Sequence, residues 1–276
     1  MRFFESRKTR NQWEAKLANR VIHNLSSYVA VLDDVKSDID LTSKTLTPWY
    51  RGQSTAGGGL VPSMYRCEIK PKYEREMIRD FKIKSTLDRD HTPKNDIDWL
   101  FLAQHHGLPT RILDWSENPL AALFFAVEDF KNEKDAEVFA LNAWTLNLSV
   151  KPGFQSVPTT ESKLFEEYVL DLVDPDIGRV PSAKLPMAFR PSSPFKRSAA
   201  QSGVFTIHGT ERAGLDRMNL NLLLVKMTIP STVKFKIFSE LNEMNITRGT
   251  MFGDLDSIAQ AIRFKYSQRS SRVEEP

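Results

Sequence analysis

A dense group of polar side chains lies in the middle of the chain, between two apolar runs. It extends from Gln104 to Ser116 and contains two adjacent histidines, a Gly-Leu-Pro turn, and then threonine, arginine, aspartate, tryptophan and serine within seven positions. Placing so many polar groups between core segments costs free energy unless they are paired or used. Two interpretations follow: a structural corner in which these groups bond one another, or one wall of a ligand site.

Two shorter polar groups occur elsewhere, Tyr50-Arg51-Gly52-Gln53 and the stretch from Arg197 to Gly203. An arginine can bind a diphosphate through two parallel hydrogen bonds, and an aromatic ring can stack on a flat base. Threonine and serine hydroxyls can bond to a ribose. These are the requirements of a nucleotide such as NAD. Taken together, the three groups favour a ligand site, although Arg51 alone fits a structural ion pair equally well.

Several common catalytic signatures are missing from the sequence. The chain has five histidines and one cysteine, and the adjacent His105 and His106 would point about 100° apart on a helix, so one metal ion would rarely bind both. There is no Gly-x-Ser-x-Gly elbow, no Gly-x-Gly-x-x-Gly fingerprint, and no Lys-Ser or Lys-Thr pair after the glycines at 57–59. We therefore expect no metal site, no serine-hydrolase triad and no Rossmann or P-loop site.

Composition sets the broad class. With 276 residues, 41% of them hydrophobic and 26% charged, the chain can form one large or two small globular domains. No apolar run approaches the roughly 18 residues of a membrane span, the first residues lack the apolar core of a signal peptide, and the single cysteine, Cys67, fits a reducing compartment. We expect a soluble cytoplasmic protein with no membrane partner. The net charge of +3 permits an acidic partner such as RNA without requiring one.

The helices and strands that must position these groups are interleaved without regular alternation, which predicts an α+β fold. Apolar spacing predicts helices over 11–33, 73–85, 118–130, 238–244 and 254–264, together with one ending at Gly107 and one near 161–173. Strands are predicted over 47–53, 110–114, 137–141, 203–207 and 220–229, and a weaker one over 233–237. Residues 54–59 are predicted to form a flexible loop, 151–194 a proline-rich insertion and 268–276 a frayed tail.

These motifs resemble the FRG domain family, named for a Phe/Tyr-Arg-Gly signature that stands here as Tyr50-Arg51-Gly52-Gln53. The resemblance continues through 60–66, the block 104–126, and the segments 200–205 and 246–256, with Ser202 and Gly253 where glutamine and proline are expected. It spans roughly 45–262. On this basis we expect an N-terminal helical segment over 1–44, an FRG domain over 45–262 that contains the insertion 151–194, and a tail over 263–276.

The resemblance implies a fold related to the ADP-ribosyltransferases: a split β-sheet core with flanking helices, and NAD as co-substrate. Arg51 matches the arginine that contacts NAD from the first strand, and 110–116 matches the segment that supports the nicotinamide ribose. At the third strand, Gln201 stands where an acid is expected. The predicted NAD-binding residues are Tyr50, Arg51, Gly52, Gln53, Thr110, Arg111, Trp115 and Ser116. The predicted catalytic residues are Arg51, His106, Asp114 and Gln201, with His106 and Asp114 as an orienting pair.

The resemblance also implies a bacterial toxin of the toxin–antitoxin or phage-defence type, which transfers ADP-ribose to a macromolecule and is controlled by an antitoxin protein. Basic residues at Arg7, Lys8, Arg10, Lys196 and Arg197 would suit an RNA or DNA acceptor, and a protein acceptor fits equally well. Two alternatives stay open. One is a nucleotide-binding regulatory module without transfer activity, and the other is an NAD glycohydrolase or a nuclease that uses the same pocket.

Overall fold

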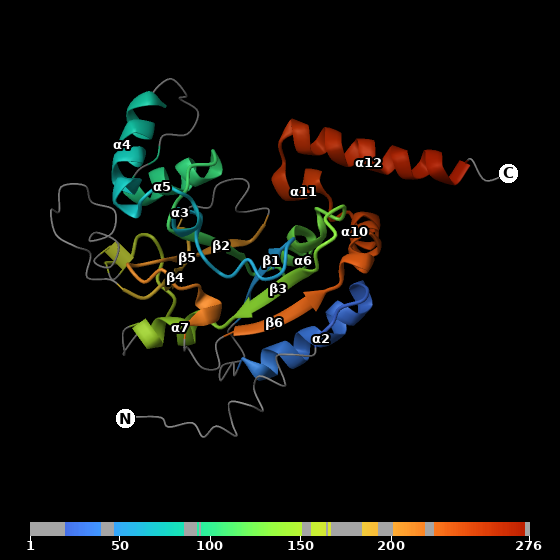
Figure 1. Ribbon diagram of the computed structural model, residues 1–276, viewed down its shortest axis with the longest axis horizontal. Helices are drawn as coiled ribbons and strands as arrows, with labels where there is room; N and C mark the ends of the chain where they lie inside the picture. The colour runs from blue at the N-terminus through green and yellow to red at the C-terminus, as the bar shows by residue number, and fades with distance from the viewer. Residues whose placement is uncertain are drawn as a thin grey trace.

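A single six-stranded sheet forms the centre of the protein. The computed structural model describes residues 20–39, 47–85, 93, 95–150, 156–163, 165–166, 184–192, 201–218 and 224–273. Every strand pairs antiparallel with its neighbours, in the order β4-β5-β2-β1-β3-β6 (Figure 1), which confirms the predicted α+β class. The strands are β1 (Trp49–Gln53), β2 (Ile112–Ser116), β3 (Ala136–Leu141), β4 (Met187–Phe189), β5 (Gly203–Ile207) and β6 (Leu224–Ile229).

The sheet consists of two halves that meet between β1 and β2. The β1–β3 ladder runs from Trp49 opposite Leu141 to Gln53 opposite Glu137, and β2 pairs along its whole length with β5. In contrast, β1 and β2 share one register pair, Tyr50 with Ser116. Beyond that pair the two strands lack the regular ladder that would close the sheet, so side chains must supply contacts across the junction.

Helix α6 (Pro119–Val127) packs directly on β1. It begins at Asn118, whose side chain accepts a hydrogen bond from Leu120 N at 3.0 Å, and it has proline in its first turn. A Cβ atom on Gly52 would lie 1.9 Å from Ala122 O and 2.7 Å from Ala126 N. Only glycine therefore permits this close approach of helix and strand.

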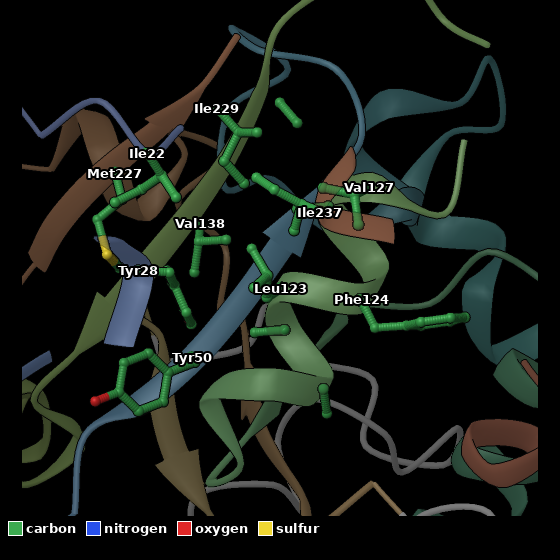
Figure 2. Close-up of a cluster of buried hydrophobic side chains, with 14 of the residues drawn as sticks. Ile22, Tyr28, Tyr50, Leu123, Phe124, Val127, Val138, Met227, Ile229 and Ile237 are labelled. Atoms are coloured by element: carbon green, nitrogen blue, oxygen red, sulfur yellow. The ribbon is translucent and has the colours of Figure 1, made fainter. Parts of the chain in front are cut away.

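The face of the sheet covered by α6 holds the largest core cluster. Helices α2 (Leu25–Asp38) and α10 (Lys234–Glu243) complete this layer. Figure 2 shows Tyr28, Tyr50, Leu123, Val138 and Met227 among the buried side chains of this cluster. A second cluster joins α4 (Glu74–Lys84) and α5 (Asp96–His105) to β2, β4 and β5, and includes Phe101 and Phe205.

The opposite face of the sheet carries a third cluster, which includes Trp49, Leu113, Trp115, Phe139 and Val204. Helix α7 (Ala143–Val150) packs beside it through Leu146. The remaining elements are α3 (Ser63–Arg66), α11 (Arg248–Phe252), α12 (Leu255–Val273) and the short 3-10 turns η1 (Pro71–Tyr73), η2 (Leu215–Arg217) and η3 (Ser231–Val233). Among the described residues, no helix is long and apolar enough to cross a membrane.

One predicted helix starts later than expected, and one predicted strand was wrong. The helix expected over 11–33 begins only at Leu25: Ile22 N donates to Thr228 O at 2.8 Å, and Asn24 then caps the helix. The strand expected over 233–237 is a 3-10 turn followed by α10, because Ile237, Phe238 and Leu241 recur at helical spacing and are buried together. Residues 1–19, where the first helix was expected to start, lie outside the described residues.

The limits of other elements also differ from the prediction. Strand β2 lies two residues after the predicted 110–114, α6 ends at Val127 rather than near 130, and α12 continues to Val273 through much of the predicted tail. The insertion 151–194 contributes β4, which pairs with β5 and is part of the sheet. Most of the helix expected near 161–173, and residues 219–223 before β6, lie outside the described part of the chain.

The loop over 54–59 is held in place rather than free, contrary to the prediction. Ala56 N donates to Asp135 O at 2.7 Å, and Gly57 N donates to Glu137 Oε2 at 3.1 Å. The buried Lys234 donates from Nζ to three carbonyl oxygens, one of them Ser54 O at 3.0 Å. The segment that follows Arg51 is therefore fixed against β3 and α10.

Candidate functional site at the junction of the two sheet halves

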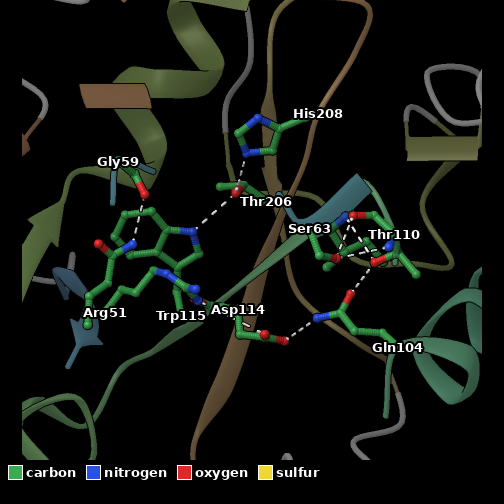
Figure 3. Close-up of polar contacts among 11 residues, drawn as sticks. Arg51, Gly59, Ser63, Gln104, Thr110, Asp114, Trp115, Thr206 and His208 are labelled. Atoms are coloured by element: carbon green, nitrogen blue, oxygen red, sulfur yellow. Dashed lines mark hydrogen bonds and ion pairs between the residues drawn. The ribbon is translucent and has the colours of Figure 1, made fainter. Parts of the chain in front are cut away.

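Arg51 bridges the two halves of the sheet. It follows Tyr50, the residue of β1 that pairs with Ser116. Its Nη1 donates to the carbonyl oxygen of Asp114 on β2 at 2.7 Å (Figure 3) and lies 4.0 Å from Asp114 Oδ2. The side chain is 18% exposed, and its Nε is buried with no hydrogen-bond partner among the described residues. The guanidinium thus links β1 to β2 where main-chain pairing stops.

The electrostatic environment of Arg51 is incompletely neutralised. Burial lowers the pKa of the Arg51 guanidinium, Asp114 raises it, and Arg66 lowers it again. Arginine nevertheless stays protonated in proteins, so Arg51 is a buried positive charge that Asp114 offsets only in part. Arg66, at the end of α3, is exposed and has no ion-pair partner among the described residues. The junction therefore favours an anionic ligand.

Asp114 joins Arg51 to a second chain of hydrogen bonds. Gln104 Nε2 donates to Asp114 Oδ1 at 2.8 Å, and the hydroxyl of Thr110 donates to Gln104 Oε1. Thr110 N in turn donates to Ser63 Oγ at 3.1 Å. Helix α5, strand β2 and helix α3 are connected in this way (Figure 3). The Asp114 side chain remains 59% exposed, which leaves its carboxylate accessible to a ligand or to water.

The polar groups of three predicted NAD-binding residues are used inside the fold. Thr110 is fully buried in the chain of bonds just described. Arg111 forms a buried ion pair with Glu74, with Nη2 2.5 Å from Glu74 Oε2. Ser116 Oγ donates to Gln201 O at 2.5 Å and accepts from Asn118 N at 2.9 Å, which fixes the turn between β2 and α6. For these residues the geometry matches the structural corner rather than the wall of a ligand site.

Three more predicted NAD-binding residues are also packed within the fold. Tyr50 and Gly52 face α6 on the other side of the sheet, and burial, with a contribution from Asp33, raises the pKa of Tyr50 to about 12. Trp115 is buried in the third cluster, and its Nε1 donates to Thr206 Oγ1 at 3.1 Å. Neither aromatic ring offers an exposed face on which a nicotinamide could stack.

The predicted pair of His106 and Asp114 is not formed. His106 follows α5, is exposed, and has its ring centroid 6.2 Å from that of Phe81. Gln104, two residues earlier on α5, takes the place beside Asp114 that was assigned to His106. The physical reason is helical spacing: side chains two residues apart point about 200° apart, so His106, at the end of α5, does not share the side on which Gln104 contacts Asp114.

The two glutamines of the predicted site lie on different segments. Gln201 Nε2 donates to Met251 O at 3.0 Å, and its main-chain oxygen receives the Ser116 hydroxyl, so Gln201 connects the start of β5 to α11. Gln53 Nε2 donates to Gly59 O at 2.9 Å, while its Oε1 is buried with no partner among the described residues. Gln53 shares a sheet face with Arg51, because alternate residues of a strand point the same way.

The described residues contain no group of three or more histidine, cysteine, aspartate or glutamate side chains that could hold a metal ion.

Comparison with known proteins identifies one region of the chain. The model of the FRG domain family matches residues 47–135. This chain carries an FRG domain. No curated protein and no solved structure matches the chain. The matched region contains Arg51, Gln104 and Asp114, so the junction between β1 and β2 is formed by the FRG domain itself. Gln201 and the rest of β5 lie outside the matched region.

Sequence reasoning missed one residue next to the FRG domain's junction, His208. It follows β5, is 1% exposed, and its Nε2 lies 3.2 Å from Thr206 Oγ1. Burial lowers the pKa of His208 to about 3, and the charges of Arg51 and Arg111 contribute to that shift. The alternation of Val204, Thr206 and His208 on one face of β5 was the only available signal, and it does not distinguish a site residue from a core residue.

Proposed function

We propose that this protein is an NAD-dependent ADP-ribosyltransferase that modifies a macromolecule. One observation carries the proposal: the buried guanidinium of Arg51 lies at a junction where the two halves of the sheet share a single residue pair. A sheet divided in this way agrees with the split sheet expected from the FRG resemblance. The positive charge of Arg51, with Arg66 nearby, suits the diphosphate of a dinucleotide.

The proposed binding residues are fewer than the sequence suggested. Arg51 holds the diphosphate. Gln53 shares a sheet face with Arg51, Gln104 bonds to Asp114, and both carry amide groups that can bond to ribose hydroxyls. Thr110, Arg111, Trp115 and Ser116 support this arrangement through their bonds inside the fold. Their contribution to NAD binding is therefore indirect.

The proposed chemistry needs a positioned carboxylate rather than a strong protein nucleophile. The bond between ribose C1′ and the nicotinamide nitrogen breaks, and its electron pair leaves with neutral nicotinamide. The ribose then has oxocarbenium character, which the exposed carboxylate of Asp114 stabilises. A lone pair of the acceptor forms the new bond to C1′, and the acceptor proton passes to Asp114. Arg51 keeps the reacting carbon in place by fixing the diphosphate.

The acceptor is proposed to be RNA, DNA or protein, and the biological role that of a bacterial toxin restrained by an antitoxin. The FRG resemblance supports this role. The basic residues that would favour a nucleic-acid acceptor, Arg7, Lys8, Arg10, Lys196 and Arg197, lie outside the described residues. Growth of bacteria on induction of the wild-type protein, compared with Arg51→Ala, tests the toxin role: equal growth of both strains would contradict it.

Incubation of the pure protein with labelled NAD and with RNA, DNA or cell extract tests the activity. Label on a macromolecule that is lost in Arg51→Ala and in Asp114→Asn supports transfer. Arg79→Ala is the matched control, because Arg79 is exposed on α4 and far in sequence from the junction. Full transfer by Arg51→Ala would exclude the proposed role of Arg51, and binding of NAD without turnover would favour a regulatory module.

NAD hydrolysis is the second candidate. The 59% exposure of the Asp114 side chain favours it, because a carboxylate open to solvent can activate water as the acceptor. In the same experiment, release of free ADP-ribose at an unchanged rate with and without macromolecules identifies hydrolysis.

A further inference from the structure

Among the described residues, three buried polar atoms on one face of the sheet lack hydrogen-bond partners. They are Nε of Arg51, Oε1 of Gln53 and Nδ1 of His208, and none has a hydrogen-bond partner among the described residues. Arg51 and Gln53 lie on the face of β1 that carries Trp49, and His208 continues the face of β5 that carries Val204. Burial lowers the pKa of His208, and the positive charges of Arg51 and Arg111 add to that effect.

The hydrogen bonds around Thr206 determine which nitrogen of His208 carries the proton. Trp115 Nε1 can only donate, so Thr206 Oγ1 accepts from it at 3.1 Å. The hydrogen of the Thr206 hydroxyl then needs an acceptor, and among the described residues His208 Nε2, at 3.2 Å, is the one that it contacts (Figure 3). If Nε2 carried the proton, that hydroxyl hydrogen would be left without an acceptor. The neutral imidazole is therefore protonated on Nδ1.

A buried N–H without an acceptor is destabilising, so an acceptor at Nδ1 would be stabilising. Within the part of the chain that the structure describes, no acceptor contacts the Nε–H of Arg51 or the Nδ1–H of His208, and positive charge acts on both groups. Such a pair is suited to anionic oxygen.

We infer that His208 is a binding residue of this site, which donates its Nδ1 proton to a phosphate oxygen of the nucleotide that Arg51 holds. The inference rests on the proposed function, because the nucleotide is NAD or its product ADP-ribose. His208 lies outside the region matched by the FRG family model, so it extends the site from β1 and β2 to the end of β5.

Two substitutions separate a ligand contact from a structural role. His208→Asn keeps a donor near the position of Nδ1 and loses the contact with Thr206, whereas His208→Gln keeps a group near Nε2 and loses the Nδ1 donor. We expect His208→Gln to bind ADP-ribose about ten- to one hundred-fold more weakly than the wild type, and His208→Asn to stay within about three-fold of it. The reverse order would show that the contact with Thr206 alone matters and would overturn the inference. His23→Gln, an exposed histidine, is the control.

Nitrogen-15 NMR of the histidine rings tests the wild-type protein directly, so it does not depend on the variants folding. We expect the His208 signal, assigned by its loss in His208→Gln, to show a neutral ring protonated on Nδ1 and to move when NAD or ADP-ribose is added. If ADP-ribose binds by calorimetry and this signal does not move, the inference is wrong and the proposed function stands. If neither NAD nor ADP-ribose binds, the proposed function fails and the inference fails with it.

Discussion

At the scale of single residues, some buried charges are neutralised by a partner of opposite sign. The ion pair of Glu74 and Arg111 is the clearest case: both side chains are under 10% exposed, and Glu74 also accepts from Arg111 N at 2.9 Å. A buried charge that loses its partner is far more costly than a pair replaced by apolar groups. Removing one partner and replacing both partners should therefore have different effects on stability. That difference distinguishes a structural role of Arg111 from the NAD-binding role that the sequence suggested.

We predict that Glu74→Ala destabilises the protein by about 3–5 kcal/mol, because it removes the carboxylate that neutralises buried Arg111. The double variant Glu74→Leu with Arg111→Met should recover most of that loss and should still bind NAD. Urea unfolding and calorimetry measure the two properties, with Glu76→Ala, exposed on the same helix, as control. Loss of NAD binding in a folded double variant would instead support a direct role of Arg111 in binding NAD.

His208 makes a second prediction at this scale, for stability against pH. Its pKa in the folded protein is about 3, below the ordinary value of 6.5, so the unfolded chain binds a proton that the folded protein excludes between these values. The stability that it contributes is complete above pH 6.5 and is lost as the pH falls toward 3. At pH 5 the loss is about 2 kcal/mol relative to pH 7.

The measurement is the unfolding free energy of the wild type and of His208→Gln at pH 7 and pH 5. Carboxylates titrate in both proteins, so the difference between the two pH responses isolates His208. We expect the wild type to lose about 2 kcal/mol more than the variant over this interval. Equal losses would mean that His208 is protonated in the folded protein without penalty.

At the scale of elements, the packing of α6 on β1 positions Arg51. Gly52 allows the helix backbone to approach the strand, and the next side chain toward the N-terminus, Arg51, is directed to the other face and into the junction. The short turn fixed by Ser116 and Asn118 sets where α6 begins. The Arg51-Gly52 signature therefore has two functions. Arg51 directs its charge into the junction, and Gly52 lets α6 pack closely on the opposite face of β1.

We predict that Gly52→Ala destabilises the protein by at least about 3 kcal/mol, because its Cβ would lie 1.9 Å from Ala122 O, a backbone atom that cannot move without shifting α6. Gly58→Ala is the matched control, since the atoms nearest to a Cβ there, Gln53 Oε1 and Thr55 O, lie at 3.7 Å. Thermal and urea unfolding of both variants measure the effect. Similar stability of the two variants would contradict the close packing of α6 on β1.

Gly52 also illustrates how far sequence could predict the site. A glycine beside an arginine indicates that either another backbone segment or a ligand approaches closely. Both causes require glycine, so the sequence cannot distinguish them. Here α6 approaches, not the nucleotide that we predicted. The same limit applies to Thr110 and Ser116, because a hydroxyl fits both a ligand contact and a structural hydrogen bond. Only the fold shows that Thr110 bonds to Gln104 and that Ser116 bonds to Gln201.

The elements themselves were easier to predict than their contacts. The strand at Arg51 and the apolar helix after Asn118-Pro119 were recognisable because local signals and burial agree there. The strand predicted over 233–237 failed because its apolar residues also fit helical spacing and packing against α6 decided between the two. His208 could not be identified at all, because its role depends on Thr206 and Trp115, which come together only across strands.

At the scale of the whole molecule, the two halves of the sheet form one body in which the pairing between β1 and β2 is the weakest connection. Each half is paired along complete strands, while the junction has one register pair and the side-chain bond of Arg51 to Asp114. The proposed NAD site lies at this connection, so ligand binding and the cohesion of the two halves should be coupled.

Hydrogen exchange measures this coupling. We predict that amides of β2 not bonded to β5 exchange faster than amides of β3, which has paired strands on both sides. Arg51→Ala should accelerate exchange in β2 and leave β3 unchanged, because it removes the bond to Asp114 O, and NAD should slow exchange in β2 of the wild type only. Arg79→Ala controls for loss of positive charge. Protection of β2 equal to that of β3, in the absence of ligand, would show that the junction is as firm as the ladders beside it.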